Sequence, residues 1–342
     1  MGKKNNESLI CLMFSVLLFS GNVFSQTANS FDINRYSTFG AGFFETYYVQ
    51  NTRFLREALS AELIAEDTAI LITKTDAGYL ALIRDQMAFH HIAQGTVNGK
   101  DWMATFWVVC NSGVSLIPTI ESVRYNFINS GLYDGLFVLQ DKETETLWNH
   151  MTGEAVYGHH AGLRMEVSNL LNMNVEQALA LDADMEIAIS DRRYNMIRST
   201  ATTYSPSNSD AKLMEQFVVT LGEEDQRRPR MDMGLGVWTD SSQRYYPLET
   251  LRSQGNYMVD TVDGRDLLVF LEPLTSTPTA IYWKSGKVEL EGREFILSDG
   301  YRIQNGQLKT ELGEQVNIEQ PQQIFTRWYG FALTFPETEV IQ

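Results

Sequence analysis

Histidine and cysteine side chains are the strongest candidates for chemistry in this sequence. All the histidines lie between residues 90 and 160: His90, His91, His150, His159 and His160. Cys110 lies in the same stretch, with three methionines nearby along the chain: Met87, Met103 and Met151. Imidazole and thiolate bind copper and zinc, and thioethers suit Cu(I). The cluster predicts a copper-type or zinc site whose ligands come from His90, Cys110, His150, His159 and His160.

The same residues also admit a purely structural interpretation. Their spacing matches no H-E-x-x-H, C-x-x-C or zinc-ribbon pattern, so the metal hypothesis rests on clustering alone. A His-His pair on a strand can place one ring inward and the other outward. Cys110 ends an apolar run that starts at Trp102, where a buried and inert thiol is common. Both interpretations stay open from the sequence.

Acid–base catalysis is a third interpretation. Glu154 follows His150 by four residues, and a carboxylate beside an imidazole can act as a general base if both line a concave pocket. A turn carboxylate in Thr152-Gly153-Glu154 is the plainer interpretation. The sequence has no G-x-S-x-G elbow and no P-loop, and Gly40-Ala41-Gly42 lacks the third glycine of a dinucleotide fingerprint. The catalytic residues, if there are any, therefore stay unknown.

The tryptophans have two possible roles, ligand binding and packing in the core. Six are present: Trp102, Trp107, Trp148, Trp238, Trp283 and Trp328. They could line a saccharide-binding groove, but in a β-rich core large aromatic residues more often pack against one another. We therefore expect them in the core.

The elements that must position these side chains are mostly short strands. Helical spacing predicts helices near 54–65, 175–181 and 211–221. Apolar runs bounded by turn residues predict strands at 69–72, 103–109, 136–139, 155–157, 267–271, 280–283, 287–290 and 294–297. The chain is thus expected to be α+β and mostly β.

An internal repeat organises these strands. Thr96-Val-Asn-Gly-Lys-Asp recurs as Thr261-Val-Asp-Gly-Arg-Asp, and an apolar strand follows each copy. Asn-Gly and Asp-Gly are favoured hairpin turns because Gly reaches positive φ freely. At the positions that match His90 and Cys110, the second copy has Gly255 and Thr275. The repeat predicts two related β-rich halves joined by a helical segment, with the candidate site in the first half only.

The predicted organisation has five segments, of which 68–342 form one globular body. They are a signal peptide (1–25), a lead-in with a helix (26–67), a first β-rich repeat that carries the His/Cys cluster (68–165), a helical connector (166–233) and a second repeat free of His and Cys (234–342).

The N-terminus has the layout of a cleavable secretory signal. Lys3 and Lys4 precede the apolar stretch 9–19, which is too short to span a bilayer, and Val23-Phe24-Ser25 offers a cleavage site. We therefore expect a periplasmic or extracellular protein whose mature chain has no membrane span. Cys11 would leave with the signal, so Cys110 would have no internal disulfide partner.

The net charge of the chain limits the kinds of partner that the protein is expected to bind. The formal net charge is −16, which argues against nucleic acid and anionic membrane surfaces because both require basic patches. A metal ion or a small ligand remains as the expected partner.

Several motifs resemble one protein family. They are Cys110-Asn-Ser-Gly-Val, Ser130-Gly-Leu-Tyr, Asp141-Lys-Glu-Thr, Leu147-Trp-Asn-His-Met-Thr-Gly-Glu-Ala-Val-Tyr-Gly, Tyr246-Pro-Leu, Trp328-Tyr-Gly-Phe-Ala and Phe335-Pro-Glu-Thr. Together with His90-His-Ile-Ala they make the chain, from about residue 68 to its end, similar to the Domain of Unknown Function 3179 family of bacterial, often exported proteins. The resemblance implies that five positions matter: His90, Cys110, Trp148, Asn149 and Gly158.

The chain also departs from the family's pattern. Trp107 stands where many members have a second cysteine, Gln94-Gly95 replaces an Asn-Asp pair, and Phe335 replaces a histidine. If those groups serve redox or metal chemistry, this chain has lost part of the site. Two hypotheses follow: an exported transition-metal-binding protein, or a non-catalytic binding or structural module of the cell envelope. Whether any reaction is catalysed stays open.

Overall fold

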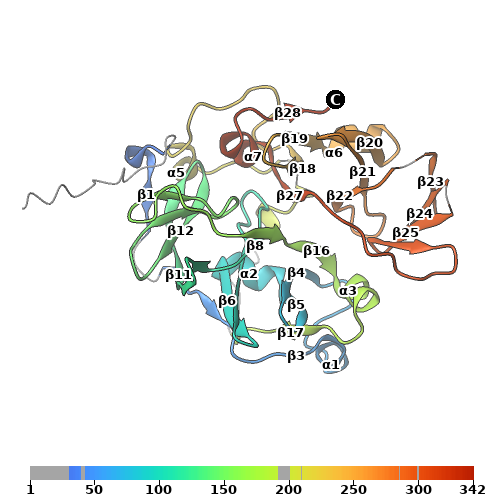
Figure 1. The fold of residues 1–342 in the computed structure, drawn as a ribbon. Coiled ribbons are helices and arrows are strands. Elements are labelled where there is room, and N and C mark those ends of the chain that lie inside the picture. The colour runs from blue at the N-terminus through green and yellow to red at the C-terminus, as the bar shows by residue number, and fades with distance from the viewer. Residues whose placement is uncertain (1–30, 40–42, 192–200, 209, 285, 299) are drawn as a thin grey trace, which may run out of the picture.

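The computed structural model describes residues 31–39, 43–191, 201–208, 210–284, 286–298 and 300–342. The predicted signal peptide, residues 1–25, lies outside the described residues. Within the described part, strands outnumber helices, which confirms a β-rich α+β protein. No helix in this part has the length and apolarity needed to cross a bilayer. Figure 1 shows two groups of strands, one around β4–β12 and the other around β18–β25.

The first group begins with a hairpin, a short helix and three more strands. These are β4 (Ala69–Thr75), β5 (Gly78–Ile83), α2 (Arg84–His90), β6 (Ile92–Val97), β7 (Lys100–Thr105) and β8 (Val114–Leu116). Four consecutive residues of β4, from Ile70 to Thr73, are buried, because the strand is covered on both faces. The β6–β7 turn is Asn98-Gly99, with φ of 51° and 78°, as the hairpin prediction required.

Strands from other segments complete two sheets around these elements. Their orders are β16-β4-β5-β17-β3 and β15-β8-β7-β6-β2. The added elements are β2 (Tyr47–Tyr48), β3 (Arg53–Phe54), α1 (Leu55–Ser60), β15 (Val167–Asn169), β16 (Leu171–Asn174), α3 (Val175–Leu181) and β17 (Glu186–Ala188). α3 begins with a capping box, in which the Asn174 and Gln177 side chains each accept a backbone N–H of the other residue.

A four-stranded antiparallel meander follows β8 in the chain. Its sheet has the order β1-β11-β12-β13-β14. The meander consists of β11 (Phe127–Tyr133), β12 (Leu136–Asp141), β13 (Leu147–Asn149) and β14 (Ala155–Tyr157). β1 (Ser37–Thr38), which follows η1 (Ile33–Arg35) in the chain, adds a fifth strand beside β11. β9 (Thr119–Ile120) and β10 (Val123–Arg124) form a separate two-stranded sheet.

The second group starts after α5 (Glu215–Val218) and again contains a hairpin, a helix and three strands. These are β18 (Met233–Trp238), β19 (Gln243–Pro247), α6 (Leu248–Ser253), β20 (Tyr257–Val262), β21 (Arg265–Leu271) and β22 (Pro278–Tyr282). A meander and a strand–helix–strand unit follow: β23 (Val288–Glu291), β24 (Glu294–Leu297), β25 (Tyr301–Gln304), β26 (Gln307–Thr310), β27 (Gln322–Arg327), α7 (Trp328–Thr334) and β28 (Glu339–Val340).

The two groups share an order of elements and a pattern of pairing. In each, a hairpin, a helix, three strands and a four-stranded meander precede a final strand–helix–strand unit. β16 pairs antiparallel with β4 and β27 with β18, whereas β17 pairs parallel with β5 and β28 with β19. In its described residues, the segment 166–233, expected to be a helical connector, contains β15, β16 and β17 besides α3 and α5, and β16 and β17 belong to the hairpin sheet of the first group.

One large apolar core joins the two groups. It combines Met103, Val109 and Phe137 of the first group with Trp328 and Phe331 of α7. Five consecutive residues of α7, from Trp328 to Ala332, are buried, so this helix of the second group packs inside the core of the first. The tryptophans expected in the core lie there, apart from half-buried Trp283: Trp102, Trp107, Trp148, Trp238 and Trp328.

Candidate functional site

Cys110, Ser112 and His150 form a hydrogen-bonded chain in the core. The Cys110 Sγ lies 2.7 Å from the Ser112 Oγ, which lies 2.8 Å from the His150 Nε2. The His150 Nδ1 lies 3.0 Å from the backbone oxygen of Phe137. None of the three side chains has solvent exposure. Of the five predicted ligands, the structure therefore joins Cys110 to His150, with a serine hydroxyl between them.

The direction of each hydrogen bond follows from one acceptor. A backbone carbonyl only accepts, so the His150 Nδ1 carries a proton and donates to Phe137. Burial lowers the pKa of His150 to about 3, which keeps the ring neutral and leaves its Nε2 as an acceptor for the Ser112 hydroxyl. The Ser112 oxygen then accepts from the Cys110 thiol. Burial also raises the pKa of that thiol, so it stays protonated and unreactive.

A tight turn over residues 107–112 holds the thiol and the hydroxyl side by side. The Trp107 N–H donates to the Ser112 carbonyl at 2.7 Å, and Asn111 adopts a φ of 59°. The Asn111 side chain accepts from Arg84 at 2.8 Å and donates to the Phe325 carbonyl at 2.9 Å. Asn is one of the few residues that tolerates this left-handed backbone, so its type serves both the turn and the contact with β27.

The same turn occurs three more times among the described residues, at 141–146, 149–154 and 272–277. The first N–H of each donates to the sixth carbonyl, at 3.2, 2.8 and 2.9 Å. In two of them the fourth and sixth side chains are threonines: Thr144 and Thr146, 2.7 Å apart, and Thr275 and Thr277, 3.0 Å apart. The fifth residue has positive φ in all four turns: Asn111 (59°), Glu145 (58°), Gly153 (67°) and Ser276 (57°). Cys110 and Ser112 thus occupy positions that threonines fill in two of the other turns.

An acidic side chain at the first position stabilises each of the two turns that carry threonines at their fourth and sixth positions. Asp141 Oδ1 accepts from the backbone N–H and the hydroxyl of Thr144, at 2.6 and 2.8 Å. Glu272 Oε2 accepts from the N–H groups of Leu274 and Thr275, both at 2.8 Å, and from the Thr275 hydroxyl. The pattern acid-x-x-Thr-x-Thr is readable in the sequence and is the signal that could have found these turns. Trp107 takes the acidic position in the cysteine turn.

His90 and His91 lie at the end of α2 and face different surroundings. The His90 ring nitrogens lie 2.6 Å from the Glu45 carbonyl and 2.8 Å from the Ser190 hydroxyl. The His91 ring packs against Phe44, Trp107 and Phe137, and its buried Nδ1 has no hydrogen-bond partner among the described residues. Burial lowers the pKa of His91 to about 3. Both rings are fixed by structural contacts.

His159 and His160 lie after β14. His159 is exposed, whereas His160 packs against Tyr125 and Trp148 with ring centroids 5.1 and 5.9 Å away. Burial, helped by His159, lowers the pKa of His160. Two of the positions that the family resemblance marked as important, Asn149 and Gly158, have clear structural roles. The Asn149 Oδ1 accepts two backbone N–H groups of the turn that follows it. Gly158 has a φ of 108°, and Thr146 lies directly against it.

The metal hypothesis finds limited geometric support. Across the described residues, no group of three or more His, Cys, Asp or Glu side chains is placed to hold a metal ion. Cys110 and His150 are two donors that share Ser112, while His90 and the pair His159–His160 make the separate contacts described above.

His150 and Glu154 both line a pocket of about 590 Å³, here called the His150 pocket. Both ring nitrogens of His150 are already used by Phe137 and Ser112, and the Glu154 carboxylate lies 3.7 Å from Arg164 Nη2. Trp148, also tied to the family resemblance, lines the same pocket and donates its Nε1–H to Asp141 at 2.9 Å. The concave location that acid–base catalysis requires is present, but the pairing of base and imidazole is not formed.

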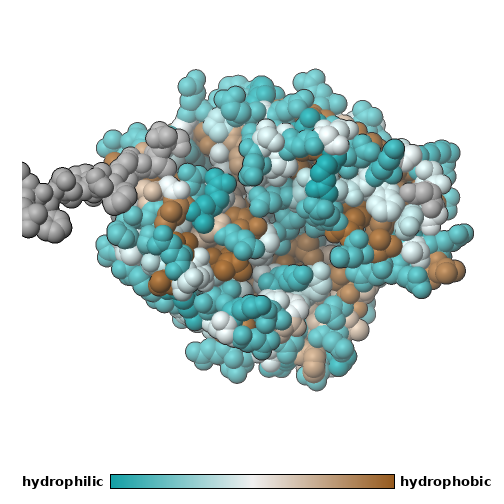
Figure 2. Space-filling view, in the orientation of Figure 1, coloured by the Kyte–Doolittle hydropathy of each residue, from teal (hydrophilic) through white to brown (hydrophobic). Residues whose placement is uncertain are grey.

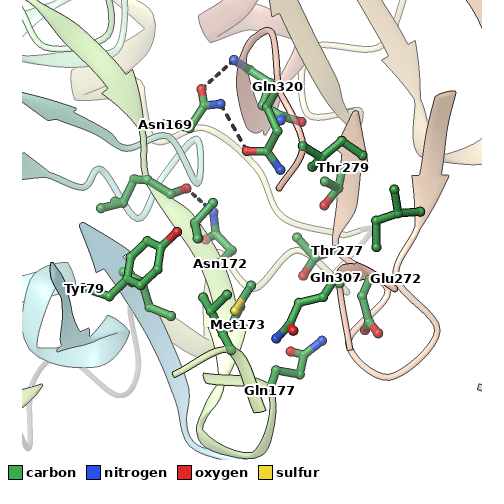
Figure 3. Close-up of a pocket in the computed structure, with 18 of the residues that line it drawn as sticks. Tyr79, Asn169, Asn172, Met173, Gln177, Glu272, Thr277, Thr279, Gln307 and Gln320 are labelled. Carbon is green, nitrogen blue, oxygen red and sulfur yellow. Dashed lines mark hydrogen bonds between the residues drawn. The ribbon is translucent and has the colours of Figure 1, made fainter. Parts of the chain in front are cut away.

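A second pocket lies between the two groups of strands and is here called the seam pocket. Its volume is about 290 Å³. Tyr79, Asn172 and Met173 lie on one side, and Glu272 and Gln307 lie on the other (Figure 3). Eight side-chain carboxamides line it: Asn169, Asn172, Gln177, Gln307, Gln315, Asn317, Gln320 and Gln323. These residues are far apart in the sequence, so no local motif predicts that they line one pocket.

Two buried side chains in the seam pocket have free hydrogen-bonding atoms. Glu272 is 3% exposed and Gln307 is 5% exposed. The Glu272 Oε1 and both amide atoms of Gln307 have no hydrogen-bond partner among the described residues. By contrast, Gln323 binds the Ala280 N–H and carbonyl at 2.7 and 2.9 Å. Buried polar atoms are usually paired, so these three atoms point to an absent partner.

The fold and the site define a β-rich protein with a buried thiol–hydroxyl–imidazole chain and a polar pocket at the junction of the two groups of strands, from here on called the two units. The chain belongs to the family described as protein of unknown function (DUF3179), whose model matches residues 49–340. No curated protein and no solved structure matches it.

Proposed function

We propose that this protein is a non-catalytic binding protein of the cell envelope that holds a small polar molecule in the seam pocket. The observation that carries the proposal is the set of unpartnered buried atoms on Glu272 and Gln307. Leaving a buried donor or acceptor unpaired costs about 1–3 kcal/mol. A ligand that pairs with these atoms would recover that free energy, which is the support for binding at this pocket.

The state of the thiol supports a role without covalent chemistry. Reactive cysteines are partly exposed and have a lowered pKa, whereas Cys110 is fully buried with a raised pKa. The seam pocket, in contrast, lies between two structural units, a common place for ligand sites. Binding at the seam pocket therefore accounts for more of the structure than chemistry at the cysteine.

The proposal can be tested before any ligand is known. Replacing Gln307 by Met keeps the shape of the side chain and removes the unpaired amide, so the free energy of unfolding of the ligand-free protein should rise by about 1 kcal/mol. Gln323→Met is the matched control: it lines the same pocket, but its amide is paired at both ends, so unfolding should become easier by about 1–3 kcal/mol. Urea titration measures both values. A loss of stability in Gln307→Met equal to that of the control would show that the Gln307 amide is already satisfied.

Transition-metal binding is the second candidate, favoured by the arrangement of Cys110 and His150 around one hydroxyl. The Sγ–Oγ and Oγ–Nε2 distances are 2.7 and 2.8 Å, so a Cu(I) ion in the place of the Ser112 hydroxyl would bind both donors once they moved inward to metal–ligand distances of about 2.0–2.3 Å. His90, His159 and His160 could join such a site only by leaving their present contacts. Titration with Cu(I) and Zn(II), with Cys110→Ala alongside, tests this candidate. Equal and weak uptake by both proteins would rule it out, and elemental analysis of the natively purified protein would support or oppose it independently.

Two further elements of the proposal concern the chain as a whole. Export with cleavage after Ser25 is proposed from the sequence of residues 1–25, and N-terminal sequencing of the mature protein tests it.

An internal duplication is proposed as the origin of the two groups of strands. Its support is the shared order of elements, the shared parallel and antiparallel pairings, and the repeated turn at residues 107–112 and 272–277.

A further inference from the structure

We propose that the ligand of the seam pocket is a neutral saccharide, a monosaccharide or the end unit of a short glycan. This inference rests on the proposed function and names the chemical class that the pocket selects. Its basis is the juxtaposition of many carboxamides, a half-buried tyrosine ring and one buried carboxylate in a small hollow between the two units.

Carboxamides match hydroxyl groups. An amide side chain offers two N–H donors and one carbonyl acceptor, and each sugar hydroxyl both donates and accepts. Gln307 presents one free group of each kind from a buried position, and the free Glu272 Oε1 adds an acceptor of the kind that binds a hydroxyl. In Figure 3 the Gln307 amide points toward Met173 and Gln177 across the pocket. A ligand rich in hydroxyls can satisfy all three orphaned atoms.

The charge of the pocket disfavours ions. Lys74 and Glu272 are its charged lining residues, and Lys74 is exposed. The Glu272 carboxylate accepts three hydrogen bonds on Oε2, from two backbone N–H groups and one hydroxyl. An anionic ligand would meet this carboxylate, and a cationic ligand would meet the Lys74 ammonium. A neutral ligand avoids both costs.

Size and apolar surface fit the same class. The volume of about 290 Å³ is at the lower end of the range for small-molecule pockets, about 300–1,000 Å³. Tyr79 and Met173 supply apolar contact on the side opposite Gln307 (Figure 3). A pyranose ring has polar edges and apolar C–H faces, so it can pair with the amides and pack against the tyrosine at once.

Asn169 shapes the pocket but is not free to bind. Its Oδ1 accepts from the Gln323 N–H at 2.9 Å, and its Nδ2 donates to the Pro321 carbonyl at 2.8 Å. This side chain ties β15 of the first unit to β27 of the second beside the pocket. The expected ligand contacts are therefore Gln307, Glu272 and Tyr79.

Ligand-detected NMR on the full mature chain tests the inference. The probes are glucose, galactose, N-acetylglucosamine, maltose and cellobiose at about 10 mM, a concentration that reveals millimolar affinities. Glucuronate, glucosamine and alanine serve as anionic, cationic and zwitterionic comparators. At least one neutral saccharide should bind, and Gln307→Met and Tyr79→Ala should each weaken it about tenfold. Gln254→Met, on the exposed end of α6, is the control and should leave binding unchanged.

The outcomes separate this inference from the proposed function. If a comparator binds, loses affinity in Gln307→Met and no neutral saccharide binds, the seam pocket is a binding site but the saccharide inference is wrong. If no probe binds and Gln307→Met is destabilised as strongly as Gln323→Met, the proposed function fails as well. If no probe binds but Gln307→Met is stabilised, the saccharide inference alone is overturned.

Discussion

Cys110, Ser112 and His150 form a hydrogen-bonded chain without solvent contact, in which Ser112 is the shared partner of the thiol and the imidazole. The hydrogen bonds run from thiol to hydroxyl to imidazole to the Phe137 carbonyl. Gly330 of α7 packs beside this chain: a Cβ at this glycine would lie 3.1 Å from the Leu136 Cδ2, a tight contact, and 3.5 Å from the Cys110 Cβ, an ordinary one. The residues that look most reactive in the sequence are thus fixed parts of the core.

Ser112→Ala should lower the free energy of unfolding by about 2 kcal/mol. The substitution removes the donor to the His150 Nε2 and the acceptor of the Cys110 thiol, and a buried group left unpaired costs about 1–3 kcal/mol. Ser60→Ala, at the exposed end of α1, is the control and should change stability by no more than about 0.5 kcal/mol. Urea denaturation compares the two. Equal values would mean that the buried hydrogen bonds contribute nothing.

Acid should destabilise the protein through its buried histidines. His91 and His150 have a pKa of about 3 in the folded protein, against 6.5 for an ordinary histidine in the unfolded chain. Because the unfolded chain binds more protons between these values, stability is lost as the pH falls from 6.5 toward 3, by about 1.4 kcal/mol per pH unit for each residue.

His91→Phe isolates one of these contributions. The ring already packs against Phe44, Trp107 and Phe137, so phenylalanine keeps these aromatic contacts and removes one titrating group. Between pH 6 and 4, its unfolding free energy should fall less steeply than that of the unmodified protein, by about 1 kcal/mol per pH unit. His159→Gln, at an exposed position, should leave the slope unchanged. An identical slope in all three proteins would show that His91 does not stay neutral on folding.

At the scale of elements, one turn occurs at four places among the described residues, and three of these places show that it performs different tasks. At residues 107–112 it buries Cys110 and connects to β27, at 141–146 it joins β12 to β13, and at 272–277 it places Glu272 in the seam pocket. The backbone hydrogen bonds and the positive φ are common to all three, while the side chains differ. The backbone conformation of the turn is therefore constant, and its contacts with the rest of the protein depend on its first, fourth and fifth side chains.

Asn111→Ala and Ser276→Ala test this division, because they change the same position of two copies of the turn. Asn111 is buried and binds Arg84 and the Phe325 carbonyl, so its replacement should cost about 2–4 kcal/mol through two lost hydrogen bonds and a less favourable left-handed backbone. Ser276 is exposed and has nearly the same φ, so its replacement should cost less than about 1 kcal/mol. Thermal unfolding of both variants measures the difference. Similar losses would mean that backbone strain, rather than the contact with β27, dominates at residue 111.

The sequence predicted elements better than it predicted sites. The strands at 155–157 and 294–297, the helix at 175–181 and both Gly-containing hairpins occur as expected, because local alternation, capping and turn residues determine them. The strand expected at 103–109 ends at Thr105, since the turn that holds Cys110 begins two residues later. The seam pocket could not be predicted: its amides come from distant segments that meet only when β15 and β16 lie beside the segment before β27.

At the scale of the whole molecule, the seam between the two units is closed on one side and hollow on the other. On the closed side, the Arg327 guanidinium donates to the carbonyls of Val109 and Met231, and the Thr326 hydroxyl donates to the Cys110 carbonyl. α7 is buried beside these contacts in the core of the first unit. These hydrogen bonds and the buried helix hold the two units together on this side of the seam.

The two units should therefore unfold in a single cooperative transition, although they resemble each other in the order of their elements. The core cluster that contains Phe137 also contains Trp328 and Phe331, so neither unit keeps a complete core when the other opens. Differential scanning calorimetry should give a calorimetric enthalpy equal to the van't Hoff enthalpy. Arg327→Met removes the buried guanidinium and its hydrogen bonds across the seam, and it should lower the transition temperature while leaving one transition, because the apolar part of the seam remains. Two transitions in the unmodified protein, or a calorimetric enthalpy about twice the van't Hoff value, would mean that each unit folds on its own and that the shared core contributes little to cooperativity.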